Sequence, residues 1–465
     1  MAERPNIVLC ICDQLRAFEV GCYGNPIIRT PNVDRIAREG VRFEHAVTNF
    51  PVCMAARSVL LSGQYNRTCT GGVSNVAYET WSGDCAMPEY PVRGRPHLRD
   101  ETLPEALQTL GYHTAVIGKW HIHSWPSDVG FDGYLIPRVH HCHSGQSFTR
   151  NGGPEFVPDG WSVDFEAAEV ERFLAEQAAA DRPFFLYYSI SPPHCPVADA
   201  PDRYRLMYRP EEVPIRPNVD LEHPLANQDY WLRVYRWDFR YYSLRLPYTE
   251  ELPEGYGLRE LIAEYYGITT WMDDAVGRML TALDDAGLAQ STIVVFTSDH
   301  GDNLGSLGLV QKGGPNEESI RIPLVMRYPR EVEPLVVTDS VASLVDVVPT
   351  LIELGQGRVP PAMQGQSLVP ALRGKPLARN HAFVETGTGA AVRTPTHLYH
   401  VSMESGTRSL GEAPTRFHDL VRDPYELNNL AGTGVEKAAA RSCDDLLREW
   451  DAVTPWLGAG SAAGP

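Results

Sequence analysis

Two apolar runs decide the fold: Pro5-Asn6-Ile7-Val8-Leu9-Cys10-Ile11-Cys12, followed by Asp13-Gln14, and Ser291-Thr292-Ile293-Val294-Val295-Phe296-Thr297-Ser298, followed by Asp299-His300. Continuous apolar runs of this length are typical of strands buried on both faces of a parallel sheet. Ligands of open α/β sheets bind outside the carboxyl ends of the strands. We therefore expect the two polar tips to face one pocket.

The side chains at these two tips are of the kind that binds a divalent cation. Asp13, Asp299 and the Gln14 amide offer hard oxygen donors, and His300 adds an imidazole nitrogen. The alternative is that acidic residues merely solvate the strand ends. Because both tips carry the pattern, the sequence favours a metal site.

A cysteine precedes an arginine by four residues in Pro51-Val52-Cys53-Met54-Ala55-Ala56-Arg57. Alone this spacing says little, because cysteine is often just a small buried hydrophobe. On a helix, however, residues four apart share one face. Beside the predicted metal site, Cys53 becomes a candidate nucleophile and Arg57 its partner.

Further motifs follow in order across nearly the whole chain. They are Thr30-Pro31-Asn32-Val33-Asp34-Arg35-Ile36-Ala37, Leu60-Leu61-Ser62-Gly63 after the Cys53 element, Gly118-Lys119-Trp120-His121, Thr297-Ser298-Asp299-His300-Gly301-Asp302, and His418-Asp419-Leu420-Val421-Arg422-Asp423-Pro424-Tyr425-Glu426-Leu427-Asn428-Asn429-Leu430. Together they resemble the sulfatase family of the alkaline-phosphatase superfamily, formylglycine-dependent type. The pairs Asp13-Gln14 and Asp299-His300 most resemble the branch that holds choline sulfatases and phosphonate monoester hydrolases.

The resemblance implies a modified residue and a metal. In that family a separate formylglycine-generating enzyme oxidises the motif cysteine to formylglycine (3-oxoalanine), whose hydrated aldehyde attacks the ester. One divalent metal ion would accompany it, with Ca²⁺ the first choice and Mn²⁺ or Mg²⁺ the alternatives. By resemblance its ligands are Asp13, Gln14, Cys53, Asp299 and His300. The substrate would be a small-molecule sulfate ester, held by fixed positive charge.

The resemblance also implies a catalytic set and one substrate-binding residue: Cys53, Arg57, Lys119, His121, His194 and Lys312, with Asn75 for the substrate. Arg57 would orient and help deprotonate the nucleophile. Lys119 and His121 would contact the sulfuryl oxygens, and either His194 or Lys312 would assist departure of the alcohol. The alternative is that these are ordinary strand-end and loop residues.

The chain departs from the family pattern at two places. The modification motif usually has a small residue after the cysteine and then proline, whereas this chain has Met54 and Ala55. The glycine-histidine pair that usually precedes the last lysine is also altered, with Leu307 in Ser306-Leu307-Gly308-Leu309. The first departure bears on modification of Cys53, and the second bears on the leaving-group side of the pocket.

The alternation of strands and helices predicts a doubly wound α/β sheet flanked by helices. Helices are expected from Glu101 with Thr102 as N-cap, over Asp164 to Ala180 and over Gly257 to Ala286, and strands over His113 to Ile117 and Phe184 to Tyr188. Residues 1–365 should form this catalytic domain, with an aromatic-rich insertion at 200–256. Residues 366–465 should form a small α+β domain with a short antiparallel sheet, with strands over Ala382 to Glu385 and Ala391 to Val401 and a helix over Val435 to Trp450.

Composition limits the remaining functional classes. The 465 residues carry a formal charge of −18, which disfavours binding to nucleic acid. No segment approaches the roughly 20 apolar residues of a membrane helix, and Met1-Ala2-Glu3-Arg4 leads almost directly into the first strand, so neither an anchor nor a signal peptide is expected. Nine cysteines without regular spacing fit reduced thiols in a cytoplasm.

Two stretches allow more than one interpretation. The 200–256 insertion holds Tyr230, Trp231, Tyr235, Trp237, Tyr241 and Tyr242, and it could cap the pocket, form a homo-oligomer contact or simply pack over the core. His140-His141-Cys142-His143 offers soft ligands, but without a second ligand pair structural zinc is not expected.

Three functions stay open at this point. The first is a metal-dependent, formylglycine-type sulfuric-ester hydrolase. The second keeps the site but acts on phosphonate monoesters or phosphodiesters, since the same charged ring accepts a tetrahedral phosphoryl group. The third is a non-catalytic protein of the same fold in which Cys53 remains a thiol.

Overall fold

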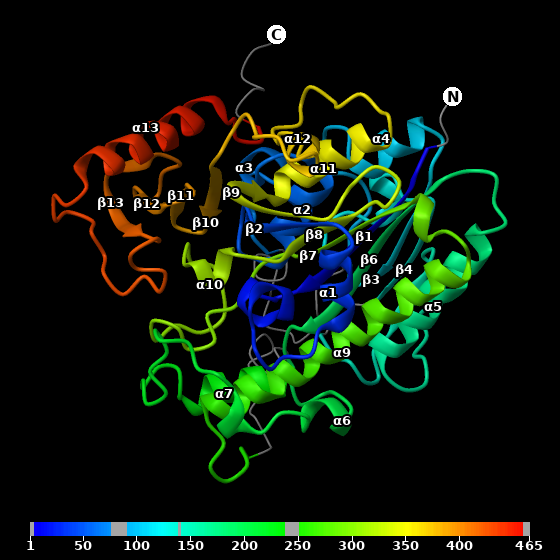
Figure 1. Cartoon of the computed structure of the whole chain (residues 1–465), viewed down its shortest axis with the longest axis horizontal. Coiled ribbons are helices and arrows are strands. Elements are labelled where there is room, and N and C mark those ends of the chain that lie inside the picture. Colours follow the sequence, from blue (N-terminus) through cyan, green and yellow to red (C-terminus); the bar gives the residue numbers. More distant parts are fainter. Residues whose placement is uncertain (1–3, 76–90, 138–140, 238–250, 459–465) are drawn as a thin grey trace.

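The computed structural model describes residues 4–75, 91–137, 141–237 and 251–458, and it shows a large mixed sheet between two layers of helices (Figure 1). The strand order is β5-β4-β3-β6-β1-β7-β8-β2-β9. The strands are β1 (Asn6–Asp13), β2 (Val41–Val47), β3 (His113–Gly118), β4 (Gly133–Pro137), β5 (Phe148–Arg150), β6 (Phe184–Pro193), β7 (Thr292–Ser298), β8 (Leu324–Arg327) and β9 (Leu335–Ser343).

The centre of the sheet is parallel, and antiparallel pairs flank it. The parallel pairs are β4 with β3, β3 with β6, β6 with β1, and β1 with β7. β5 runs antiparallel to β4, and β8 runs antiparallel to both β7 and β2. The carboxyl ends of the central strands therefore lie along one edge of the sheet, as the two apolar runs predicted.

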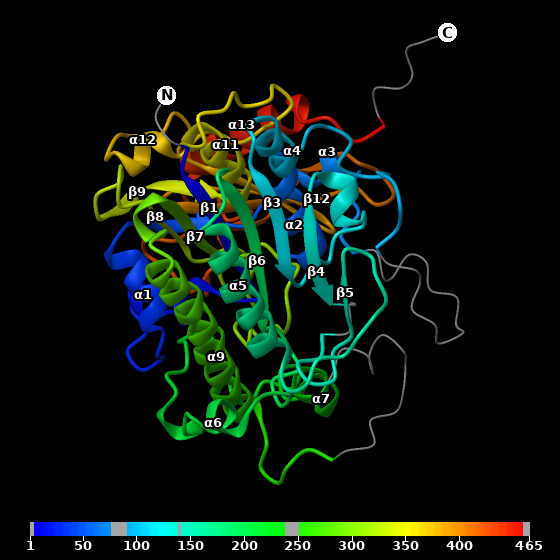
Figure 2. The same ribbon diagram turned by 90° about the vertical axis from the view of Figure 1, so that its right-hand side faces the viewer.

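Helices cover both faces of the sheet, because the side chains of each strand alternate between them. Ile7, Leu9 and Ile11 of β1 pack in one apolar cluster with helices α2 (Cys53–Ser62), α4 (Leu103–Thr109) and α11 (Leu344–Leu354). Val8, Cys10 and Cys12 pack in a second cluster with α1 (Pro31–Arg38), α5 (Ser162–Gln177) and α9 (Leu258–Asp285). Figure 2 shows α5 and α9 against the sheet. The doubly wound arrangement is thereby confirmed.

The helix starts follow the capping signals of the sequence. At α4 the Glu105 carboxylate accepts a hydrogen bond from the Thr102 backbone N–H at 2.9 Å, which completes a capping box with Thr102. At α9 the Glu260 carboxylate accepts one from the Gly257 N–H at 2.9 Å. Short helices complete this part of the fold: α3 (Asn66–Cys69), α6 (Asp202–Arg205), α7 (Asp229–Arg236), α10 (Glu317–Ile320) and α12 (Val369–Leu372).

The C-terminal region forms a four-stranded antiparallel sheet with one long helix, seen beside the large sheet in Figure 1. Its elements are β10 (Ala382–Thr386), β11 (Gly389–Arg393), β12 (His397–Met403), β13 (Leu410–Asp419) and α13 (Lys437–Val453). The single strand expected over Ala391 to Val401 is wrong. Pro395 lacks the N–H that a ladder needs, and a turn closed by Thr394 and His397 splits the segment into two strands. The domain boundary at residue 365 stays a prediction.

The aromatic insertion is partly described. Residues 238–250, with Tyr241 and Tyr242, lie outside the described ranges. Tyr235 on α7 is buried at 1% exposure, whereas Tyr230 is 39% exposed. In the described part of the chain, none of the helices has the length and apolar character needed to cross a membrane.

Candidate active site

Four adjacent parallel strands each bring one polar residue to the same edge of the sheet. In the order β3-β6-β1-β7, Lys119 follows β3, His194 follows β6, Asp13 ends β1 and Asp299 follows β7. This edge is the expected ligand-binding position of an open α/β sheet. The strand pairing thus gathers residues that are nearly 300 positions apart in the chain.

Turns with left-handed backbone aim these residues. Gly118 has φ +99°, and a Cβ there would lie 2.0 Å from the Ser189 carbonyl oxygen, so only glycine fits directly before Lys119. Gln14 and His121 are non-glycine residues with φ of 67° and 44°. Such conformations cost free energy and cluster at functional sites.

Asp13, Cys53, Asp299 and His300 form a compact, buried cluster. One potential ligand atom from each lies within 4.8 Å of the others. All four are at most 3% exposed. Cys53 Sγ lies 3.5 Å from Asp13 Oδ1 and 3.1 Å from His300 Nε2. The structure therefore brings together the two strand tips and the cysteine, as predicted.

The His300 ring is oriented to present a lone pair to this cluster. Its Nδ1 donates to the Gly301 carbonyl at 2.8 Å, which leaves Nε2 as the acceptor nitrogen. Nε2 lies 3.6 Å from a carboxylate oxygen of both Asp13 and Asp299. A metal-binding histidine is usually held in this way by a carbonyl behind it. Two hard carboxylates with an oriented imidazole fit a divalent cation.

Arg57 joins the two carboxylates from behind. Its Nε donates to Asp299 Oδ2 at 3.0 Å, and one terminal nitrogen donates to Asp13 Oδ2 at 3.3 Å. Its other terminal nitrogen donates to Ser189 Oγ at 2.6 Å. Arg57 is fully buried, and it fixes the two acids relative to each other through one guanidinium.

The two acids respond in opposite directions to these surroundings. Burial opposes ionisation of Asp13, but Lys119, His194 and Arg57 hold the pKa of its carboxyl well below the ordinary value. Burial and the nearby Asp13 raise the pKa of Asp299. Two carboxylates this close disfavour simultaneous ionisation, and a bound cation would relieve that repulsion.

Cys53 occupies the first turn of a buried helix, with Arg57 one turn further along α2. Burial raises the pKa of the Cys53 thiol, and Asp13 adds to this effect. The cations Lys312 and Lys119 outweigh both, so the net pKa lies well below the ordinary value. The surroundings of Cys53 therefore favour an anionic group at this position.

Two lysines contact residues of the cluster or their neighbours. Lys119 Nζ donates to Asp13 Oδ2 and, at 3.1 Å, to His141 Nδ1. Lys312 Nζ donates to the Gln14 side-chain carbonyl. The Gln14 amide nitrogen in turn donates to Asp302. Gln14 therefore engages both Lys312 and Asp302 here, and its role as a metal ligand stays a prediction.

Three histidines lie around Lys119 and Cys53. His121 and His194 each place a ring nitrogen within hydrogen-bonding reach of Cys53. His194 Nδ1 donates to the Cys195 carbonyl at 2.6 Å, and burial lowers the pKa of His194 to about 4. His194 is thus neutral at pH 7 in the free protein.

Sequence reasoning missed several residues that support the site. Tyr235 donates to Asp302 Oδ1 at 2.7 Å and accepts a hydrogen bond from the Gln311 N–H, so the aromatic insertion reaches the lysine loop. Asp302 follows Asp299 and His300 in one quoted motif, and that proximity was the available signal. Ser189 had no comparable signal, and the sequence marked His141 only as part of a cluster of soft metal ligands.

Asn75 and the histidine cluster at 140–143 adjoin or overlap segments outside the described ranges. Asn75 is partly buried just before residues 76–90, which lie outside the described ranges, and its substrate-binding role stays a prediction. His141, Cys142 and His143 belong to neither of the two metal-ligand groups found among the described residues. His140 lies outside those residues.

An acidic cluster ringed by lysine and arginine at the carboxyl edge of an α/β sheet is the arrangement expected of an enzyme that hydrolyses anionic esters. The family model described as Sulfatase matches residues 5–357. The chain belongs to the sulfatase family, within the alkaline-phosphatase superfamily, and is a sulfuric-ester hydrolase.

Relatives from several bacteria match most of the chain. An ulvan-active sulfatase from Formosa agariphila is 29% identical over 445 residues, which cover 92% of this chain and 77% of the relative. An N-acetylglucosamine-6-O-sulfatase from Bacteroides thetaiotaomicron is 27% identical, with 96% and 86% covered. A multifunctional alkaline phosphatase superfamily protein from Trinickia caryophylli is 29% identical, with 96% and 95% covered.

Solved structures share the fold. A protein in complex with its substrate D-glucosamine-2-N,6-O-disulfate has a TM-score of 0.77 at 24% identity, with 96% of this chain and 97% of the other covered. A phosphonate monoester hydrolase of Agrobacterium radiobacter has a TM-score of 0.71 at 22% identity, with 96% of each covered. At these identities the likeness concerns the fold alone.

Proposed function

We propose that this chain hydrolyses sulfate monoesters through a formylglycine made from Cys53, with one divalent cation held by Asp13, Asp299 and His300 beside it. Ca²⁺ is the first choice, and Mn²⁺ or Mg²⁺ are alternatives, because the donors are mainly hard oxygens. The observation that carries this proposal is the convergence of the four ligand atoms within 4.8 Å in a buried, cation-ringed site. A formylglycine-generating enzyme would be the maturation partner.

The residues present fit both groups. When bound, the cation supplies Lewis-acid activation, and the hydrated aldehyde supplies a hydroxyl nucleophile. Position 53 suits such a nucleophile because its surroundings favour an anion. Met54 and Ala55 both lie buried in α2, so the departure from the usual motif is compatible with the folded structure.

The protein's own cations hold the ester. Lys119 and Lys312 both act electrostatically on Cys53, and Arg57 holds the two carboxylates beside it. In a site that excludes water, such preorganised positive charge stabilises the negative charge that develops during ester cleavage. Arg57 also fixes the two carboxylates and so orients the nucleophile between them.

Departure of the alcohol requires a proton donor, and Lys312 suits this role in the free protein. Burial lowers the pKa of Lys312, but Cys53 and Asp13 raise it more, so the ammonium is retained. His194 is neutral until a nearby anion raises its pKa, and binding of a sulfate ester would supply that anion. The two residues are therefore distinguishable by experiment.

A phosphonate or phosphodiester substrate is the second candidate. The relative from Trinickia caryophylli is described as a multifunctional alkaline phosphatase superfamily protein, which supports a substrate range wider than sulfate esters. The choline sulfatase and phosphonate hydrolase branch stays a prediction, and so do a cytoplasmic location and a homo-oligomeric state.

The test compares turnover of an aryl sulfate and an aryl phosphonate monoester by the purified wild type, Cys53→Ala and Cys443→Ala. Cys443 is a buried cysteine on α13, so Cys443→Ala controls for loss of a buried thiol. We expect a higher kcat/KM for the sulfate and loss of turnover only in Cys53→Ala. Retention of more than about a tenth of wild-type turnover by Cys53→Ala would contradict the proposal.

A further inference from the structure

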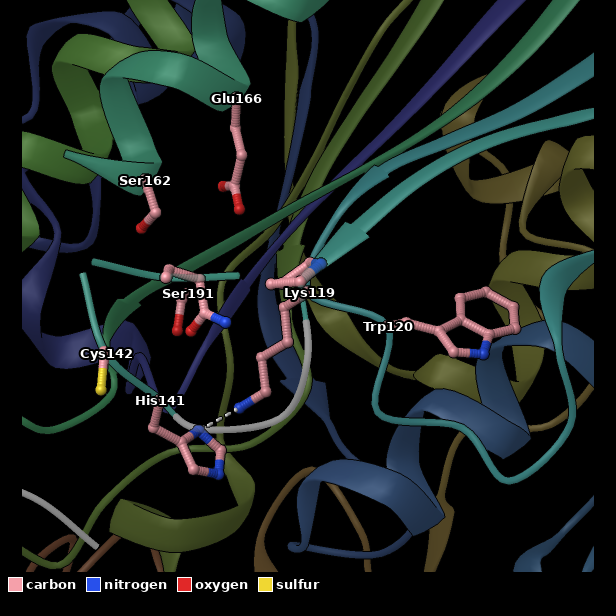
Figure 3. A pocket seen from close by; sticks show the side chains of 9 residues that line it. Lys119, Trp120, His141, Cys142, Ser162, Glu166 and Ser191 are labelled. Atoms are coloured by element: carbon pink, nitrogen blue, oxygen red, sulfur yellow. Dashed lines mark hydrogen bonds between the residues drawn. The ribbon is translucent and has the colours of Figure 1, made fainter. Parts of the chain in front are cut away.

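His141, which the sequence marked only as part of a cluster of soft metal ligands, contacts two of the predicted catalytic residues, Lys119 and His194. His141 lines a small cavity of about 20 Å³ together with Lys119, Ser191 and Glu166, and Figure 3 shows its ring directed at the Lys119 ammonium. We propose that His141 is a positioning residue that holds Lys119 and His194 in their working arrangement. This inference rests on the proposed function, because it concerns the same site.

The first contact is a hydrogen bond whose direction is fixed by chemistry. A lysine ammonium has only donors, so His141 Nδ1, 3.1 Å from Lys119 Nζ, must be the acceptor. The His141 ring therefore carries its proton on Nε2 and is neutral. Consistent with this, burial lowers the pKa of His141 well below its ordinary value, and the nearby Lys119 and His194 lower it further.

This acceptor determines where the ammonium sits. Lysine is a flexible point charge, and Lys119 is shared between the Asp13 carboxylate and His141. Without the His141 acceptor, the ammonium would be drawn further onto Asp13 and away from the sulfuryl group. His141 thus keeps one positive charge available to the substrate.

The second contact is a ring stack. The rings of His141 and His194 lie parallel, with centroids 4.2 Å apart and planes 13° apart. The edge of His194 is fixed by its Nδ1 hydrogen bond to the Cys195 carbonyl. His141 fixes its face, so the orientation of His194 Nε2 depends on both.

The backbone of His141 is also unusual. His141 has φ 51°, a left-handed conformation that is uncommon for a residue with a side chain. One side chain thus links the ends of β3 and β6 on the substrate side of the sheet.

Two substitutions separate the two contacts. His141→Asn keeps an acceptor atom at the Nδ1 position but removes the ring, and His141→Phe keeps a ring against His194 but removes the acceptor. His141→Ala removes both. His400 is a buried histidine of β12 outside the site, so His400→Asn controls for general loss of packing.

We expect His141→Phe to lower kcat/KM by at least about tenfold for all leaving groups and to weaken inhibition by inorganic sulfate, because both depend on Lys119. His141→Asn should retain sulfate inhibition and lose turnover mainly with poor leaving groups, because that step depends on His194. His141→Ala should combine the two losses.

Two results would overturn the inference. One is kcat/KM and sulfate inhibition within about twofold of wild type in all three His141 variants. The other is equal losses in the Asn and Phe variants that follow thermal stability, as in the His400→Asn control. The Cys53→Ala variant distinguishes this failure from failure of the proposed function, since its inactivity would leave the site assignment intact.

Discussion

Two ionic clusters of this protein are buried to a similar extent but differ in how their acidic side chains are paired. Arg393 of β11 donates to both oxygens of Glu317 at 3.1 Å, so this acid has its own bidentate partner. In the active site, Asp13 and Asp299 share the guanidinium of Arg57, and Asp13 also accepts a hydrogen bond from Lys119. Both arrangements are no more than 4% exposed.

This difference in pairing distinguishes a cluster that stabilises the fold from one that can bind a metal ion. The Glu317 pair is closed and joins the C-terminal sheet to the segment after the active-site loop, which is a stabilising role. The Asp13 and Asp299 pair leaves acidic oxygens facing a cysteine and an oriented imidazole, an arrangement that is costly unless a cation completes it. Burial of charge alone therefore does not identify a site, whereas acidic oxygens that converge on other potential metal ligands do.

The largest expected effect on activity follows removal of Asp13 or Asp299 from the active-site cluster. Asp13→Ala and Asp299→Ala should each lose bound metal and more than about 100-fold in kcat, because even outer-shell changes at metal sites cost 10–100-fold. Metal analysis and kinetics on the same samples provide the measurement. Asp419→Ala, in the largely buried His397, Asp419 and Glu436 group, is the matched control and should leave metal stoichiometry unchanged. Full metal occupancy in both site variants would place the metal elsewhere.

The next effect concerns Lys312 and His194, the two candidate proton donors to the leaving group. Lys312→Ala or His194→Ala should lower kcat by roughly 100-fold, as when a preorganised oxyanion donor is removed. The loss should be smallest for activated aryl esters and larger for alkyl esters, because poor leaving groups need protonation. Kinetics with a leaving-group series measures this. An equal loss across the series would exclude a leaving-group acid at that position.

The smallest effect on catalysis is expected at the Glu317 and Arg393 pair. Glu317→Gln leaves Arg393 buried without its partner and should lower the free energy of unfolding by about 3–5 kcal/mol, with unchanged kcat per folded molecule. Glu176→Gln, at an exposed pair on α5, should cost no more than about 0.5 kcal/mol. Denaturant unfolding measures both.

The Glu317 effect should also depend on pH. Although burial opposes ionisation, Arg393 lowers the pKa of Glu317 from the ordinary 4.5 to about 2. A depressed carboxyl pKa contributes stability that is fully present above 4.5 and lost as the pH falls towards 2. The gap between wild type and Glu317→Gln should therefore be constant at neutral pH and narrow below pH 4.5. A gap that widened in acid would contradict this assignment.

Much of the fold and site could be predicted from local sequence. The buried runs ending at Asp13 and Asp299 predicted parallel strands, and the structure brings their tips together. The long helix over Gly257 to Ala286 followed from its apolar spacing, and α9 occupies almost the same range. These features depend on periodicity and on residues that stand next to one another in the chain.

The rest depends on contacts between distant segments. Ser189 lies in a strand whose residues are all buried, so nothing local marks its hydrogen bond to Arg57. His141 meets Lys119 and His194 only after β3 and β6 pair. In the C-terminal sheet, by contrast, the split at Pro395 was readable from the sequence, since proline interrupts a strand ladder.

The mass of the tryptic peptide that contains Cys53, taken from a preparation with measured sulfatase turnover, tests the nucleophile most directly. Conversion of the thiol side chain to the aldehyde removes about 18 Da, and the change must fall on Cys53. We predict that this lighter peptide accounts for the active fraction and that turnover scales with its proportion. Full turnover from a preparation in which Cys53 is entirely an unmodified thiol would contradict the formylglycine mechanism.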